Sequence, residues 1–84
     1  MNLNLLNWLK DSKYRIKTLK LLYTQPMLPS ELARQLDVNR ASMSRILNDL
    51  RGKELIEELP SESRTVIQKL TNNGRKTAKY FLGA

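Results

Sequence analysis

The chain contains neither cysteine nor histidine. Without cysteine it has no disulfide framework, thiolate zinc site or cysteine nucleophile. Without histidine it lacks the commonest general base and the commonest transition-metal ligand. No apolar run approaches the roughly 18–20 residues of a transmembrane helix, and residues 1–10 lack the basic region and cleavage site of a secretory signal. These absences predict a cytoplasmic binding protein that is not an enzyme, with no metal, cofactor, small-molecule ligand or membrane partner.

Positive charge is abundant. The 84 residues include 15 Lys and Arg against eight Asp and Glu, a formal net charge of +7. Residues 1–27 and residues 59–84 each hold five basic residues and one acidic residue, so both ends of the chain are basic. Residues 28–58 hold five basic and six acidic residues, so the middle is nearly neutral. This excess predicts a polyanionic partner. The short length and the 40% hydrophobic content favour one small globular domain.

Apolar residues at helical spacing predict four helices in the first part of the chain. We expect them at residues 2–10, 12–23, 29–36 and 40–53. Ser12 and Asn39 are suitable N-caps for the second and fourth helices, because their side-chain oxygens accept hydrogen bonds from free backbone N–H groups. Residues 37–39 alone join the third and fourth helices. Two helices joined by so short a turn are typical of a helix-turn-helix.

Two short, partly β-branched runs, residues 56–59 and 65–69, flank a five-residue loop and predict a β-hairpin, or wing. Thr71 is a suitable N-cap for a last helix ending near Leu82. Gly74 in its first turn costs about 1 kcal/mol of helix propensity, which close packing there would explain. The predicted fold class is mainly α with a small β-hairpin (α+β), a winged helix-turn-helix. Its single domain (1–84) would comprise an N-terminal helix (1–11), the helix-turn-helix core and wing (12–70) and a C-terminal helix (71–84).

Several segments in this order carry a family resemblance. They are Pro29-Ser30-Glu31-Leu32-Ala33-Arg34-Gln35-Leu36, Ser42-Met43-Ser44-Arg45-Ile46-Leu47 and Leu70-Thr71-Asn72-Asn73-Gly74-Arg75. The chain from Ser12 to Leu82 resembles the MarR/ArsR-like winged-helix transcriptional regulators, and its start is similar to that of short archaeal members. The resemblance implies a homodimer on pseudo-palindromic double-stranded DNA, with residues 40–53 in the major groove and the wing, residues 56–69, on the backbone or minor groove.

This sequence departs from the family pattern at two places. The family usually has Ser or Thr where Leu28 stands, so the side-chain cap of the third helix is lost. The family's wing tip usually shows an Asp-x-Arg-Arg pattern, whereas this one reads Ser61-Glu62-Ser63-Arg64 and holds one arginine.

The fourth helix has two faces. Periodicity assigns Met43, Ile46, Leu47 and Leu50 to the core, and the opposite face is short and polar. An ordinary solvated face fits that pattern, and so does a recognition helix that reaches base edges in the major groove. With the family resemblance we favour base reading, and the candidate residues are Arg40, Ser42, Ser44, Arg45 and Asn48.

Other polar residues are candidates for the DNA backbone. On the wing they are Ser61, Ser63, Arg64 and Lys69, unless this is a plain polar turn. On the second helix, Lys13 and Lys17 lie either near phosphates or on a solvated face. Arg15 has a structural alternative, in which it holds a carboxylate from the acidic middle.

The two ends of the chain are apolar and have three interpretations: they cover their own core, pair with a second subunit, or lie on a membrane. A single base, Lys10, argues against the membrane. We favour a dimer interface that includes Leu5, Leu6, Trp8, Leu9, Phe81 and Leu82. The alternative to a DNA-binding regulator is a winged-helix protein-interaction module of a transcription or replication assembly.

Overall fold

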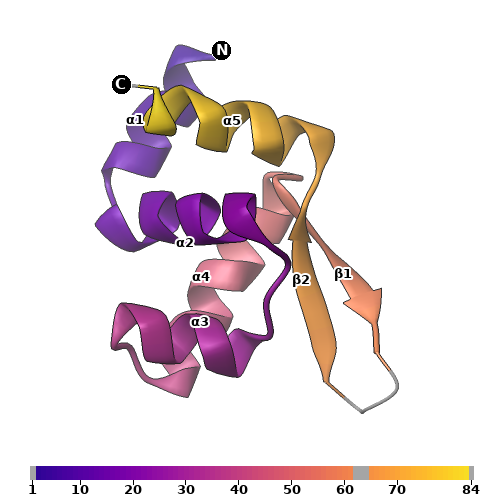
Figure 1. Ribbon diagram of the computed structural model, residues 1–84. Helices are drawn as coiled ribbons and strands as arrows, with labels where there is room; N and C mark the ends of the chain where they lie inside the picture. The colour runs from indigo at the N-terminus through magenta and orange to yellow at the C-terminus, as the bar shows by residue number, and fades with distance from the viewer. Residues whose placement is uncertain (1, 62–64, 84) are drawn as a thin grey trace.

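Within residues 2–61 and 65–83, which the computed structural model describes, the chain forms five helices and a two-stranded antiparallel hairpin (Figure 1). In chain order they are α1 (Leu3–Lys10), α2 (Lys13–Thr24), α3 (Pro29–Leu36), α4 (Arg40–Gly52), β1 (Ile56–Pro60), β2 (Val66–Leu70) and α5 (Asn72–Leu82). This is the predicted winged helix-turn-helix. The expected elements are present, and no helix or strand end differs from its expected position by more than one residue.

The turn between α3 and α4 follows from its two polar residues. Asp37 ends α3 in the left-handed region, with φ of 55°, a conformation that aspartate tolerates better than most residues. The side chain of Asn39 then accepts a hydrogen bond from the backbone N–H of Ser42 at 2.7 Å, so the predicted N-cap of α4 is confirmed. Together they set α4 against α3.

Helix α3 starts at Pro29, as predicted, and Leu28 at its N-cap position makes no side-chain hydrogen bond. Half of a capping box nevertheless remains, because the backbone N–H of Leu28 donates to Glu31 Oε1 at 3.0 Å. The cap is therefore reduced rather than lost. Ser12, at the N-cap position of α2, also makes no side-chain capping bond.

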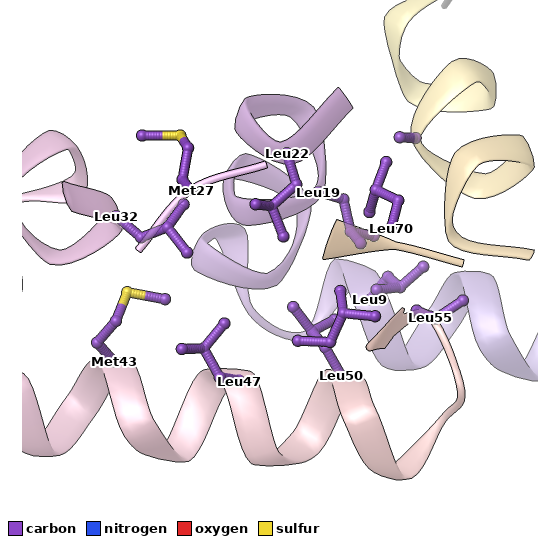
Figure 2. Close-up of a cluster of buried hydrophobic side chains, with 12 residues drawn as sticks. Leu9, Leu19, Leu22, Met27, Leu32, Met43, Leu47, Leu50, Leu55 and Leu70 are labelled. Atoms are coloured by element: carbon purple, nitrogen blue, oxygen red, sulfur yellow. The ribbon is translucent and has the colours of Figure 1, made fainter. Parts of the chain in front are cut away.

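The buried core lies between α4 and the other helices. Figure 2 shows Met43, Leu47 and Leu50 pointing from α4 toward the rest of the buried cluster, and Met43 and Leu50 are at most 1% exposed. The cluster also includes Leu9, Leu19, Leu22, Met27, Leu32, Leu55 and Leu70. Burial of one face of α4 is thus confirmed, with Ile46 partly buried beside it. The opposite face of the helix is left to solvent.

The hairpin is attached to the helices at two places. Backbone hydrogen bonds of 3.1 and 2.8 Å join Met27, between α2 and α3, to Gln68 of β2. At the other end of β2, a Cβ on Gly74 would stand 1.8 Å from the carbonyl oxygen of Leu55. The close packing expected at Gly74 is therefore real, and its neighbour is the backbone that enters β1. Thr71 Oγ1 accepts from the Gly74 N–H at 3.0 Å, which confirms the N-cap of α5.

Helices α1 and α5 lie at the end of the molecule that carries both termini, opposite α3 (Figure 1). Leu9, predicted in a dimer interface, is fully buried in the chain's own core, so it has no surface to offer a partner. Leu5, Trp8 and Phe81 are partly buried and pack against the same core. Among the described residues, the large apolar side chains left exposed at this end are Leu3 (70%), Tyr80 (47%) and Leu82 (47%).

Candidate nucleic-acid interface

The solvent face of α4 brings the predicted base-reading residues together. Arg40, Ser44 and Asn48 are exposed and recur every four residues, so they form one stripe along the helix. Arg45 is exposed beside that stripe. Ser42 is half-buried, and its backbone N–H is already bound by Asn39. The face therefore presents two guanidinium groups, hydroxyls and an amide on a helix whose other side is fixed in the core.

The stripe on α4 runs beside two hollows. Ser44 and Asn48 line a groove with Glu58, Val66 and Gln68 of the hairpin, and we name it the α4–wing groove. A second hollow continues toward the start of α4. It is lined by Arg40, Met43 and Ser44 of α4, by Pro29, Ser30 and Ala33 of α3, and by Thr65. The polar face of α4 and the hairpin thus border one continuous surface.

Arg51 joins α4 to both strands of the hairpin. Its Nη1 donates to Asn48 Oδ1 at 2.8 Å and its Nη2 to Gln68 Oε1 at 3.2 Å. Its Nε forms an ion pair with Glu58 Oε1 at 3.2 Å. Gln68 is 1% exposed, and its amide nitrogen lies 3.5 Å from Glu58 Oε2. This network fixes the hairpin relative to α4.

Sequence reasoning did not identify Arg51, Glu58 and Gln68 as part of the site. Arg51 follows Asn48 by three residues, the spacing at which helical side chains meet, so that contact was readable from the sequence. The pairing of Arg51 with the hairpin depends on strand register, which places Glu58 opposite Gln68. Nothing in the local sequence specifies that register.

The wing residues are placed differently from one another. The hydroxyl of Ser61 donates to the carbonyl of Thr65 and so closes the base of the loop. Lys69 stands opposite Glu57 in the hairpin register. Since neighbouring strand residues alternate sides, Lys69 lies on the other face of the hairpin from Gln68, where it lines a hollow with Glu57 and Arg51. Ser63 and Arg64 fall outside the described residues.

Lys13 and Lys17 are exposed on α2, where each ammonium group lies within 6 Å of the Tyr14 ring, at 5.3 and 5.9 Å. Lys17 also lines a shallow hollow with Gln35 and Leu36 at the end of α3. Neither lysine lines the two hollows next to α4, whose walls come from α3, α4 and the hairpin.

Arg15 has a structural role: it holds a carboxylate from the acidic middle of the chain, as one of its two interpretations predicted. Its Nη2 lies 3.4 Å from Asp49 Oδ2, an acidic residue of α4. The same guanidinium group donates to the carbonyl of Trp8 at 2.6 Å and lies 3.9 Å from the centroid of the Trp8 ring. Asp49 of α4 is thus engaged by Arg15, and Glu58 of β1 is engaged by Arg51.

A family model for the HVO_A0261 N-terminal domain matches residues 4–82. The chain belongs to this family. Among curated proteins, none matches the sequence significantly. Across the described residues, none of the helices is long and apolar enough to cross a bilayer.

Solved structures of MarR-family winged-helix regulators are similar in fold, which confirms the predicted resemblance. ZitR of Lactococcus lactis has a TM-score of 0.81 at 24% identity, with 86% of this chain and 51% of that chain covered. MepR, a transcription regulator of the Staphylococcus aureus multidrug efflux pump MepA, gives 0.79 at 24% identity, covering 86% and 56%. FabT of Streptococcus pneumoniae, solved in complex with DNA, gives 0.78 at 28% identity, covering 82% and 50%. The family member described here spans about half the length of these structures.

Proposed function

We propose that this chain is a sequence-specific, double-stranded DNA-binding transcriptional regulator. The observation that carries the proposal is the exposed polar stripe of Arg40, Ser44 and Asn48 on α4, with Arg45 beside it. In this proposal α4 enters the major groove, which is about 12 Å wide and admits a helix. The hairpin lies on the backbone or in the minor groove. The likeness to FabT, a structure that contains DNA, supports this placement.

The charge distribution supports contact with phosphates. The net charge is +7. Glu58, which lines the α4–wing groove, and Asp49, the acidic residue of α4, are each paired with an arginine. Arg40 and Arg45 therefore face DNA with little opposing negative charge from these neighbours. Neutralised phosphates release counterions, and this release supplies much of the affinity of such proteins for DNA.

The proposed assembly is a homodimer on a pseudo-palindromic site. At the end formed by α1 and α5, the exposed apolar side chains include Leu3, Tyr80 and Leu82. Burying them against a second copy would remove them from water. Two-fold symmetry then places the two α4 helices about one DNA turn apart, roughly 34 Å.

A selection from random double-stranded oligonucleotides with the purified protein tests the proposal. We expect an enriched site with two-fold symmetry and half-site centres about 10 bp apart. We also expect at least about 10³-fold tighter binding to that site than to random DNA. A winged-helix module that contacts proteins instead would bind DNA weakly and without enrichment of any sequence, and this outcome would reject the proposal.

A further inference from the structure

The amide of Asn48 is held by a side chain that is itself held by the hairpin. Arg51 donates to Asn48 Oδ1 at 2.8 Å, and the same guanidinium group is bound by Gln68 and Glu58 on the two strands. Gln68 is 1% exposed and its backbone is bonded to Met27. Arg51 is therefore anchored at a buried point of the fold.

The chemistry of arginine determines which way this amide faces. A guanidinium group has only hydrogen-bond donors, so the atom of Asn48 that faces it must be the carbonyl oxygen. The NH2 group of Asn48 is then turned away from Arg51. Asn48 is exposed and lies on the α4 stripe, so the group it presents to a partner is a donor.

A free asparagine in the major groove reads adenine with both atoms of its amide, its oxygen accepting from N6 and its nitrogen donating to N7. That pairing needs the oxygen and the nitrogen turned to the same base edge. In this chain the oxygen is engaged by Arg51. The donor that remains matches bases with acceptors on their major-groove edge, namely O6 and N7 of guanine or O4 of thymine. Adenine also offers N7, but its neighbouring N6 amino group is a second donor that the NH2 group of Asn48 cannot pair with, so adenine loses the two-bond pairing that would favour it.

We propose that Arg51 is a positioning residue that makes Asn48 select guanine or thymine at one base of each half-site. The hairpin thereby influences base preference without contacting that base, because Gln68 and Glu58 hold Arg51 in place. This inference rests on the proposed function, since it requires α4 to lie in the major groove.

Exchanging Asn48 for Asp tests the donor directly. A carboxylate keeps a partner for Arg51 but presents an acceptor where the NH2 group stood. In a random-oligonucleotide selection, Asn48→Asp should reduce the preferred guanine or thymine at one base per half-site by about tenfold, the factor for one hydrogen bond. Bases with exocyclic amino groups, cytosine or adenine, should gain there. Asn73→Asp, the same change on the exposed face of α5, controls for the added charge and should leave every base preference unchanged.

Exchanging Arg51 for Met tests the positioning. Without the guanidinium donor the Asn48 amide turns freely, so adenine should become accepted at the same base, with a gain of at least about fivefold relative to guanine or thymine. The preferences at the other bases should persist. Arg75→Met removes one arginine from exposed α5 and is the matched control for charge. Circular dichroism of each variant verifies that the helices are retained.

The outcomes separate this inference from the function on which it rests. If the unmodified protein enriches no site, the proposed function itself fails. If it enriches a site, but Asn48→Asp leaves every base preference unchanged, Asn48 does not read DNA as a donor. If Arg51→Met weakens binding equally at all bases, Arg51 has a structural role only. Adenine as the preferred base of the unmodified protein at the position that Asn48→Asp alters would also overturn the inference.

Discussion

The guanidinium group of Arg15 lies 3.9 Å from the centroid of the Trp8 ring and donates to the Trp8 carbonyl at 2.6 Å. It also forms an ion pair with Asp49 of α4. Lys53, which follows α4, lies over the same ring at 5.3 Å. One arginine of α2 therefore joins α1 to α4, so the end of the molecule proposed for dimerisation has a fixed position relative to the helix proposed to read bases.

The first prediction concerns this junction. Arg15→Met keeps the apolar stem but removes the cation over Trp8 and the partner of Asp49. We expect the free energy of unfolding, measured by urea denaturation, to fall by about 1–2 kcal/mol. Lys17→Met removes an exposed cation 5.9 Å from the Tyr14 ring. This control should change the free energy of unfolding by less than about 0.5 kcal/mol. Equal unfolding midpoints for both variants would show that Arg15 contributes nothing to the junction.

The second prediction uses two glycines with opposite surroundings. A Cβ on Gly74 would overlap the carbonyl of Leu55, whereas a Cβ on Gly52 meets nothing within 4 Å. Alanine has the better helix propensity by about 1 kcal/mol, but we expect Gly74→Ala to destabilise the fold by about 2–3 kcal/mol because of the overlap. Gly52→Ala should be neutral or stabilising by up to about 1 kcal/mol. Thermal unfolding followed by circular dichroism measures both, and the account is wrong if Gly74→Ala is also neutral.

The third prediction separates the core from the proposed dimer surface. Leu9 is buried, whereas Leu3 and Leu82 are exposed. Leu9→Asp should abolish folding, because an unpaired carboxylate would be buried. The double variant Leu3→Asp/Leu82→Asp should retain the helical circular dichroism of the unmodified chain and shift sedimentation equilibrium toward monomer. An unmodified protein that is monomeric at high micromolar concentration, with and without DNA, would contradict the dimer.

Much of the fold was readable from the sequence because local signals were strong. Pro29 at the start of α3, the cap at Asn39 and the helical spacing of Met43, Leu47 and Leu50 each specify an element without knowledge of its neighbours. The same spacing separated the buried and polar faces of α4. The order of these elements predicts the winged helix-turn-helix, and the resemblance of residues 29–36 and 70–75 adds the family.

Features that depend on contacts between residues distant in the sequence could not be predicted from the sequence. The burial of Leu9 requires knowing that α1 folds back onto α2, which its leucines alone do not specify. The junction of Arg51 with Glu58 and Gln68 depends on hairpin register and on the bridge to Met27. Strand alternation places Lys69 on the other face of the hairpin from Gln68, and its contact with the DNA backbone stays a prediction.

The fourth prediction concerns the charge of the wing loop. Arg64→Ala removes one positive charge from the sequence between β1 and β2. If Arg64 contacts a phosphate, Arg64→Ala should bind the selected site and random DNA more weakly, by similar factors. The slope of log affinity against log salt should fall by roughly 1 per subunit. Fluorescence anisotropy at several salt concentrations measures this slope, and an unchanged slope would remove Arg64 from the interface.

The central claim is that α4 reads bases, and Arg45 on its exposed face tests it most directly. An arginine in the major groove offers a fork of two donors to guanine O6 and N7, worth about 1–3 kcal/mol of discrimination. The measurement is the affinity of Arg45→Ala for the selected duplex and for a scrambled duplex of the same length, across a salt series, with Arg75→Ala as the control for charge. We predict that Arg45→Ala loses about 1–3 kcal/mol on the selected duplex and much less on the scrambled one, while Arg75→Ala preserves the ratio of the two affinities. Equal weakening of Arg45→Ala on both duplexes would contradict base reading by α4.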